Sequence, residues 1–454
     1  MKITRHLAEF VACTPSTDIP VDAREHARRA FLDTMGVTLA GSREDASRIA
    51  AELAREQGGV EEASVLGHHF RVPASEAALV NGTSAHALDF DDVSMSMRGH
   101  PSVPLVPAVL ALGERLGSTG REAIDAFILG FEVECKIGRL IGAPHYELGW
   151  HPTATFGTLG AAAACARLLR LDPERTCLAL GIAASMASGS RRNFGSMTKP
   201  LHAGWAARNG IAAATLAARG FTADDEALEA QDGWLHASSG GAPVDPSPIE
   251  RLGAPWEIVS PGIGVKLYPC CYFTHLSIDA ALQVRPEVAS NLRQIEAVRV
   301  SVSPGTMMVL RTDPPRTGLE GKFSMEYVVA AALTDGDVSL ATFTDDAVAR
   351  PAVRDVMMRV RVTEDGPPSS APIGGSAVVE VACSDGALVR SLLTEVPRGD
   401  PQNPLSSAQL AAKFRDCAKP LLSGNEIEQT IRMIETMDEL ATIRELTDPL
   451  MAEN

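Results

Sequence analysis

The segment from residue 86 to residue 102 holds the densest group of side chains that could move protons. It contains one histidine, three carboxylates within four positions, and a second histidine between glycine and proline: His86, Asp89, Asp91, Asp92 and His100. An imidazole titrates near neutral pH, and a carboxylate beside it can fix which ring nitrogen carries the proton. The pattern predicts an acid–base site. The alternative interpretation is a helix end with solvated acids and a histidine in a loop.

The same carboxylates could instead bind Mg²⁺, which prefers oxygen ligands. Helical enzymes that bind diphosphates through such a cluster carry a second acidic motif, which is missing from this sequence. They also line their pockets with aromatic residues, which make up only 5% of this chain. We therefore expect no metal ion at this segment.

Three other segments carry side chains that could hold an anion. His151 precedes a proline and an Ala/Gly-rich segment, where Thr153 or Thr155 could cap a helix. Lys199 lies in a basic, Gly-punctuated loop of an otherwise acidic chain. Lys266 lies at an expected domain junction, where ligand clefts commonly form. Each has a purely structural alternative: a histidine bonded to backbone, a solvated basic loop, or a linker lysine.

The composition narrows the classes of partner. The chain has 454 residues, with 41 basic and 57 acidic side chains and a net charge of −16. Such a charge repels phosphate backbones and anionic lipids, so we expect no nucleic-acid or membrane partner. The eight cysteines form no C-x-x-C motif, and the N-terminal residues lack the apolar core of a secretion signal. These features predict a cytoplasmic protein with reduced thiols.

Helical periodicity dominates the chain up to about residue 261. Apolar residues recur close to a 3.6-residue period, and many segments are rich in alanine and glycine, which lets helices approach closely. The predicted helices are 22–40, 74–88, 104–115, 121–139, 156–169, 173–187 and 203–219. We therefore expect a large all-helical domain of residues 1–269 to position most of the side chains above.

The pattern changes after residue 269, where apolar residues alternate. The predicted strands are 295–302, 357–363, 377–383 and 387–393, and the last two are joined by a Ser-Asp-Gly turn. The predicted helices between them are 274–292, 322–335 and 344–357, and 364–376 is expected to be a flexible loop.

The C-terminal segment 406–446 is helical again. An isolated helix pair would expose its apolar faces, so we expect it to return to the first domain. The predicted fold class is mainly α. A large all-helical domain, completed by residues 399–454, is combined with a smaller α+β domain of residues 270–398 inserted before the C-terminal helices.

None of these motifs is specific alone, but their combination resembles one enzyme family. The strings NGTSAHALDFDD, RGHPS, GWHPT, FGSMTKPLHAG and GVKLYP have the order and spacing of the MmgE/PrpD family. The resemblance covers essentially the whole chain. The family's activities include 2-methylcitrate dehydration, cis-aconitate decarboxylation and iminodisuccinate epimerisation. The local strings MRGHPS, HY-x-x-GWHPT and NFGSMTKP are most similar to the epimerase.

The resemblance implies a homodimer with no metal or organic cofactor and with a small polycarboxylate substrate bound between the two domains. Carried over by position, the family's site falls on Asp89, His100, His151, Lys199, Lys266 and Tyr327. We expect His100, Lys266, Asp89 and Tyr327 to be catalytic, and Arg98, His151 and Lys199 to bind substrate.

The shared chemistry is proton movement at the carbon next to a carboxylate, where developing charge needs nearby cations. Arg98, Lys199 and Lys266 could supply them, with Lys266 and His100 as the acid–base pair and Tyr327 as a second donor. The main prediction is an epimerase of the iminodisuccinate type or a closely related lyase. The alternatives are a decarboxylase or dehydratase of the cis-aconitate or 2-methylcitrate type, and a non-catalytic carboxylate-binding protein.

Overall fold

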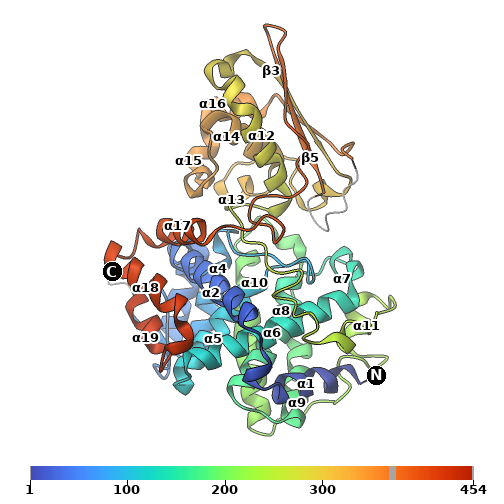
Figure 1. Cartoon of the computed structure of the whole chain (residues 1–454), viewed down its shortest axis with the longest axis vertical. Coiled ribbons are helices and arrows are strands. Elements are labelled where there is room, and N and C mark those ends of the chain that lie inside the picture. Colours follow the sequence, from blue (N-terminus) through green and yellow to red (C-terminus); the bar gives the residue numbers. More distant parts are fainter. Residues whose placement is uncertain (1, 368–374, 452–454) are drawn as a thin grey trace. The chain divides into compact units, whose positions relative to one another are not determined.

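The segments with helical and alternating patterns adopt those structures in the computed structural model, which describes residues 2–367 and 375–451 (Figure 1). These residues form two units. The first comprises the described residues of Met1–Asn193, Met197–Gly264 and Ser406–Asn454, and the second Phe194–Ser196 and Val265–Leu405. The sequence had placed these boundaries at 269/270 and 398/399. The prediction of a mainly α fold is confirmed.

The first unit consists mainly of α-helices that follow one another along the chain. They are α1 Ile3–Cys13, α2 Val21–Gly41, α3 Asp45–Gln57, α4 Ala74–Ala87, α5 Ser102–Leu116, α6 Gly120–Ile141, α7 Ala143–Glu147, α8 Pro152–Leu168, α9 Pro173–Met186, α10 Thr198–Ala218, α11 Trp234–Ser239, α17 Ser407–Ala418, α18 Gly424–Glu435 and α19 Arg444–Thr447. Strands β1 Ala63–Ser64 and β2 Arg71–Val72 form a short antiparallel pair. Its 3₁₀ helices are η1 Ser16–Asp18, η2 Arg191–Asn193, η3 Ile249–Arg251, η8 Met437–Glu439 and η9 Asp448–Leu450.

Glycine allows α4 and α10 to pack backbone against backbone. A Cβ atom on Gly204 would lie 2.2 Å from the carbonyl oxygen of Leu79, and one on Gly82 would lie 2.8 Å from the Cα atom of Gly204. Any larger residue would force the helices apart. This contact matters for the site because α4 carries His86, whereas α10 carries Lys199 and His202.

Two helices begin earlier than the apolar periodicity suggests. Helix α8 begins at Pro152, since proline fits the first helical position, where no backbone N–H is needed. Thr153 and Thr155 therefore lie inside the helix, and the prediction that one of them is its N-cap is wrong, because His151 occupies that position. Helix α10 begins at Thr198, so Lys199 belongs to its first turn and not to a loop.

The second unit combines a four-stranded sheet with helices, as predicted. Strands β3 Ile295–Val302, β4 Val360–Thr363, β5 Ala377–Cys383 and β6 Leu388–Arg390 lie in the order β4-β3-β5-β6. Strand β3 is parallel to β4 and antiparallel to β5, and Val298 pairs with Val360 on one side and Val381 on the other. Strands β5 and β6 form the predicted hairpin. Residues 368–374 of the predicted loop 364–376 lie outside the described residues.

Helices α12 His275–Val288 and α14 Met325–Asp335 pack against each other and against this sheet (Figure 1). The predicted helix 344–357 is two helices, α15 Asp345–Ala349 and α16 Pro351–Met357, because Pro351 cannot continue the first and starts the second. The remaining elements are α13 Gly318–Gly321 and the 3₁₀ helices η4 Tyr272–Thr274, η5 Ala289–Gln294, η6 Thr306–Val309 and η7 Leu340–Phe343.

The C-terminal helices belong to the first unit, where α17 packs on α2 (Figure 1). The Lys413 ammonium on α17 lies 2.7 Å from the Asp33 carboxylate on α2 and donates a 2.6 Å hydrogen bond to the carbonyl oxygen of Phe90. All three residues are buried. The returning helix therefore fixes the backbone between Asp89 and Asp91. None of the described helices is long and apolar enough to cross a bilayer.

Candidate active site

The loop between α4 and α5 brings the carboxylates and His100 back toward α4. Asp89 and Arg98 adopt left-handed conformations with φ of 53° and 52°, which is uncommon outside glycine and is tolerated best by short polar residues such as aspartate. Backbone bridges join Val93 to Gly264 and Ser94 to Gly99. These contacts hold a buried, irregular loop in one conformation, which is a common feature of functional sites.

Four histidine rings lie together in the first unit. The ring centroids of His86 and His100 are 4.6 Å apart, those of His86 and His151 are 5.8 Å apart, and those of His151 and His202 are 5.2 Å apart. Each ring comes from a different place: the end of α4, the loop before α5, the N-cap of α8 and the first turns of α10. The tertiary structure therefore builds one site from three sequence motifs.

Asp91 contacts two of these histidines through its side chain. The Nδ1 atom of His86 lies 2.9 and 3.0 Å from the two carboxylate oxygens, and the Nδ1 atom of His100 lies 2.9 Å from Oδ2. Burial alone would raise the pKa of Asp91, but the two imidazoles outweigh it and hold the pKa well below its usual range. Asp91 is therefore a carboxylate that accepts two ring N–H groups.

Lys199 supplies the positive charge of the site. Its ammonium lies 2.5 Å from Oδ1 of Asp89, and both side chains are only 5% exposed. The same oxygen lies 3.9 Å from Nε2 of His100. An ammonium, a carboxylate and an imidazole thus meet in a largely desolvated place, where electrostatic interactions are stronger than in water.

The other histidines are neutral at physiological pH. Burial lowers the pKa of His86 to about 3, that of His151 well below its usual value, and that of His202 to about 4. The Nδ1 atoms of His151 and His202 are 3.0 Å apart, so one donates a hydrogen bond to the other. The ring that accepts this bond keeps an N–H on Nε2, and the ring that donates it keeps a lone pair on Nε2.

Asp92 is the next residue after Asp91, but its side chain forms hydrogen bonds with the first residue of α5. It accepts hydrogen bonds from the backbone N–H (3.2 Å) and the hydroxyl of Ser102. Burial, with contributions from Asp33 and Asp91, raises its pKa to about 8, and the bonds from Ser102 oppose the shift only in part. Asp92 is therefore largely protonated at neutral pH.

The raised pKa of Asp92 predicts a pH-dependent stability. The folded protein keeps a proton that the unfolded chain releases near pH 4, so this stabilisation is complete below pH 4 and is lost as the pH rises to about 8. Asparagine cannot ionise. We expect Asp92→Asn to become progressively more stable relative to the wild type between pH 5.5 and 8.5, as measured by urea unfolding. An equal difference at both pH values would contradict the assignment.

His86, Asp89, Asp91 and His100 could also surround a cation, because one potential ligand atom from each lies within 4.8 Å of the others. Two features favour acid–base chemistry instead. The ammonium of Lys199 already lies beside Asp89, and the Nδ1 atoms of His86 and His100 each lie 2.9 Å from an oxygen of the Asp91 carboxylate. The expectation of a site without metal remains a prediction.

The remaining predicted site residues differ from these in exposure or in the unit to which they belong. Arg98 is exposed. Lys266 and Tyr327 belong to the second unit, whereas Asp89, His100, His151 and Lys199 share the first.

Both residues of the second unit are fully buried. Tyr327 lies in that unit's apolar core and donates a 2.5 Å hydrogen bond to the carbonyl oxygen of Thr342. Burial raises its pKa to about 12. Its role as a second proton donor stays a prediction.

Sequence reasoning placed His86 and Asp91 in the acid–base segment and His202 in the basic segment around Lys199, but it gave none of the three an individual role. The string HALDFDD indicated that His86 and an aspartate could meet, since residues that follow the end of a helix can fold back on its last turn. It did not show which of three aspartates faces the rings. His202 follows Lys199 by three positions, which places both on one face of a helix, but that helix was predicted to begin only at residue 203.

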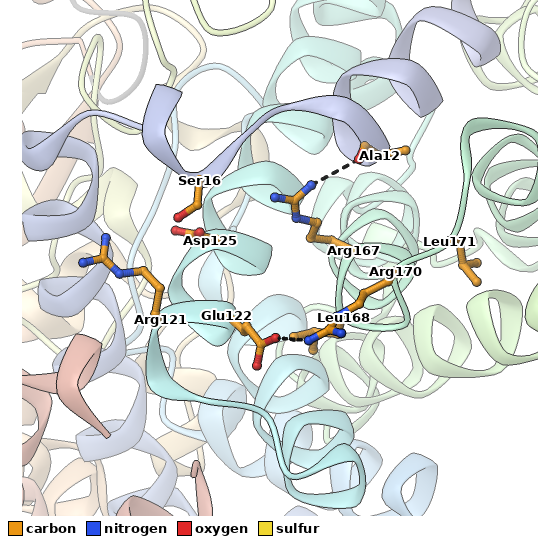
Figure 2. Close-up of a pocket in the computed structure, with 9 residues that line it drawn as sticks. All are labelled: Ala12, Ser16, Arg121, Glu122, Asp125, Arg167, Leu168, Arg170 and Leu171. Carbon is orange, nitrogen blue, oxygen red and sulfur yellow. Dashed lines mark hydrogen bonds and ion pairs between the residues drawn. The ribbon is translucent and has the colours of Figure 1, made fainter. Parts of the chain in front are cut away.

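A pocket of about 400 Å³ in the first unit is lined by other residues (Figure 2). Its arginines are engaged by neighbouring groups: Arg167 donates to the carbonyl oxygens of Val11 and Ala12, and Arg170 forms a 2.7 Å ion pair with Glu122. These contacts join α8 to α1 and α6. The pocket contains none of the predicted site residues.

Comparison with known proteins assigns the chain to a family. Residues 5–247 match the MmgE/PrpD N-terminal domain and residues 268–439 match the MmgE/PrpD C-terminal domain. The chain is 29% identical to the human cis-aconitate decarboxylase over 93% of its own length and 89% of the relative's. It is 30% identical to the mouse enzyme (93% and 88%) and 29% identical to that of Aspergillus terreus (99% and 96%). These matches confirm both the predicted resemblance and an enzyme of this type, so the chain belongs to the MmgE/PrpD family.

Proposed function

We propose that this protein is a cofactor-independent lyase that decarboxylates a small unsaturated polycarboxylate of the cis-aconitate class. The observation that carries the proposal is the buried pair of Lys199 and Asp89 beside His100, whose Nδ1–H faces Asp91. The decarboxylase activity of the relatives supports this reaction over the epimerisation that the local motifs had suggested.

The reaction requires a proton donor and a place for negative charge. In cis-aconitate the bond to the departing carboxyl group breaks, and its electron pair forms a new double bond to the central carbon. The electrons of the old double bond then take a proton at the far carbon. The products are carbon dioxide and an unsaturated dicarboxylate. No electron acceptor is needed, because the substrate supplies its own conjugation.

The residues of the first unit match these needs. Lys199 can pair a substrate carboxylate and stabilise charge as it develops. His100 can carry the proton on Nε2 as an imidazolium, which Asp91 stabilises, and deliver it to carbon. His151 and His202 are neutral, and the ring of this pair that keeps its hydrogen on Nε2 can donate a hydrogen bond to another substrate carboxylate. We also propose that two copies of this chain form a homodimer. Light scattering would measure the mass of the particle in solution.

The test follows each candidate substrate by proton NMR in D₂O. The purified protein is incubated separately with cis-aconitate, 2-methylcitrate, citrate and iminodisuccinate, and a His100→Asn variant serves as the matched control. We expect cis-aconitate to lose carbon dioxide and to gain one deuterium at the carbon that is protonated, and the variant to lose most of this activity.

Other outcomes would replace the proposal. Deuterium entering iminodisuccinate with its skeleton intact would indicate an epimerase, and loss of water from 2-methylcitrate or citrate would indicate a dehydratase. No change in any substrate, together with a ligand-induced rise of the thermal midpoint, would indicate a binding protein. Equal decarboxylation by wild type and variant would remove His100 from the mechanism.

A further inference from the structure

We propose that Asp91 is a positioning residue that holds His86 and His100 in the same tautomer at the same time, so that both rings present a basic Nε2 to the site. The inference deepens the proposed function, on which its kinetic test rests. Nothing in the family comparison assigns a role to Asp91 or to His86.

The surroundings of His100 fix its tautomer. Its Nδ1 atom lies 2.9 Å from Oδ2 of Asp91 and 3.0 Å from the backbone carbonyl oxygen of Asp92. Both neighbours are acceptors, so Nδ1 must carry the hydrogen. In the neutral ring the lone pair is then on Nε2, which is the nitrogen nearer to Asp89. The backbone N–H of His100 donates to the hydroxyl oxygen of Thr153 (3.0 Å), so the ring's attachment point is held as well.

His86 has the same tautomer for the same reason. Its Nδ1 atom lies within 3.0 Å of both oxygens of Asp91, and its Nε2 atom has no hydrogen-bond partner among the described residues. The side chains of His86 and Asp91 are both 0% exposed. A buried lone pair without a hydrogen-bond partner costs free energy. We therefore infer that Nε2 of His86 accepts a hydrogen bond or a proton from the substrate. The rings of His86 and His100 are 4.6 Å apart, edge to face, which places them at one site.

Asp91 acts through the histidines and not on the substrate. Its side chain is fully buried, and its two oxygens face two ring N–H groups. A carboxylate can accept both bonds at once because it has two equivalent acceptor oxygens. An amide has one acceptor oxygen and one NH₂ donor. Nδ1 of His86 lies 2.9 and 3.0 Å from the two side-chain oxygens of Asp91, so either orientation of the amide in an Asp91→Asn variant places the NH₂ group against it. His86 must then turn its lone pair toward the amide and place its hydrogen on Nε2.

The matched control is Asp92→Asn. Asp92 is the next residue, is equally buried, and bonds through its side chain to Ser102. It contacts His100 only through its backbone, which the substitution leaves in place. Both variants remove one buried carboxyl group from the same loop, so a general effect on folding should appear in both.

The kinetic experiment measures decarboxylation of cis-aconitate against pH for the wild type and both variants. We expect Asp91→Asn to lower kcat by about 10²- to 10⁴-fold with KM within about threefold, since a wrong tautomer of His86 and an imidazolium of His100 without its carboxylate impair proton transfer without touching substrate contacts. The pH profile should also shift, with the histidine limb moving to lower pH, because the imidazolium loses its carboxylate. Asp92→Asn should keep kcat within about threefold and retain the wild-type profile at neutral pH.

A second measurement determines the tautomers of the two histidines and does not depend on an activity assay. Solid-state ¹⁵N NMR of protein labelled in its histidine rings distinguishes a protonated from an unprotonated Nδ1. Among the wild-type signals of rings with Nδ1–H and a bare Nε2, we expect one that disappears in His86→Gln and another that disappears in His100→Gln. Because this spectrum needs no Asp91 variant, it decides the question even where Asp91→Asn does not fold.

The two measurements separate the inference from the proposed function. Activity combined with Nε2–H signals for both rings would overturn the role of Asp91 and leave the decarboxylase intact. The expected signals in a protein that acts on none of the carboxylates would support the positioning and overturn the function. An unchanged kcat in Asp91→Asn would overturn the inference, as would stoichiometric metal in the purified protein by plasma mass spectrometry, since the group would then be a metal centre.

Discussion

Replacing Lys199 by methionine is expected to lower kcat/KM by about 10²- to 10³-fold, the size found when one charge-stabilising group is removed from an active site. Its ammonium lies 2.5 Å from Asp89 and is the cation of the histidine group. The variant keeps the length of the side chain but has no charge with which to pair a substrate carboxylate. Steady-state decarboxylation assays measure the effect.

The loss of Lys199 also leaves Asp89 buried without its cation, so stability must be separated from catalysis. The double variant Lys199→Met/Asp89→Asn removes both charges and should recover most of the stability but none of the activity. Arg192→Met is the matched control, because Arg192 is an exposed cation only seven positions away. Its kcat/KM should stay within about twofold of the wild type. A Lys199→Met variant with wild-type kcat/KM would remove Lys199 from the mechanism.

Replacing Lys413 by methionine is expected to lower the free energy of unfolding by about 3–5 kcal/mol, as is usual when one partner of a buried ion pair is removed. Its ammonium lies 2.7 Å from Asp33 and also holds the carbonyl oxygen of Phe90. Burial already raises the pKa of Asp33, with Lys413 opposing, so the variant leaves an uncompensated buried carboxylate. Urea unfolding monitored by circular dichroism measures the change.

Two further variants make this interpretation specific. Lys419→Met removes an exposed lysine just after the same helix and should change stability by no more than about 0.5 kcal/mol. The double variant Lys413→Met/Asp33→Asn should recover part of the loss, since no buried charge remains. It should not recover full activity, because the carbonyl of Phe90, between Asp89 and Asp91, has still lost its donor. Equal effects at both lysines would contradict a site-specific ion pair.

The secondary structure of this protein is largely determined locally. Strands 295–302 and 377–383 were predicted at their observed bounds. In the first, Val298, Val300 and Val302 alternate, and such a pattern has one favourable register when one face of a sheet is buried. The second precedes a Ser-Asp-Gly turn, which fixes where the strand ends. Helix ends were less certain. Helices α8 and α10 begin at residues 152 and 198, where a proline or a polar residue starts the helix before its apolar periodicity becomes visible.

The sequence by itself determined which chemical groups the protein possesses. It also determined the family, because His100, His151, Lys199 and the DFDD segment occur in an order that is typical of that family. Only the tertiary structure decided which groups meet. The close contact of α4 with α10 brings Lys199 to Asp89, 110 positions apart in the chain, and the ring of His151 contacts those of both His86 and His202. The tertiary structure also decides that Asp91, and not Asp89 or Asp92, contacts both His86 and His100 through its side chain. The direction of each side chain depends on helix packing and on the conformation of the loop, which cannot be read from the order of residue types.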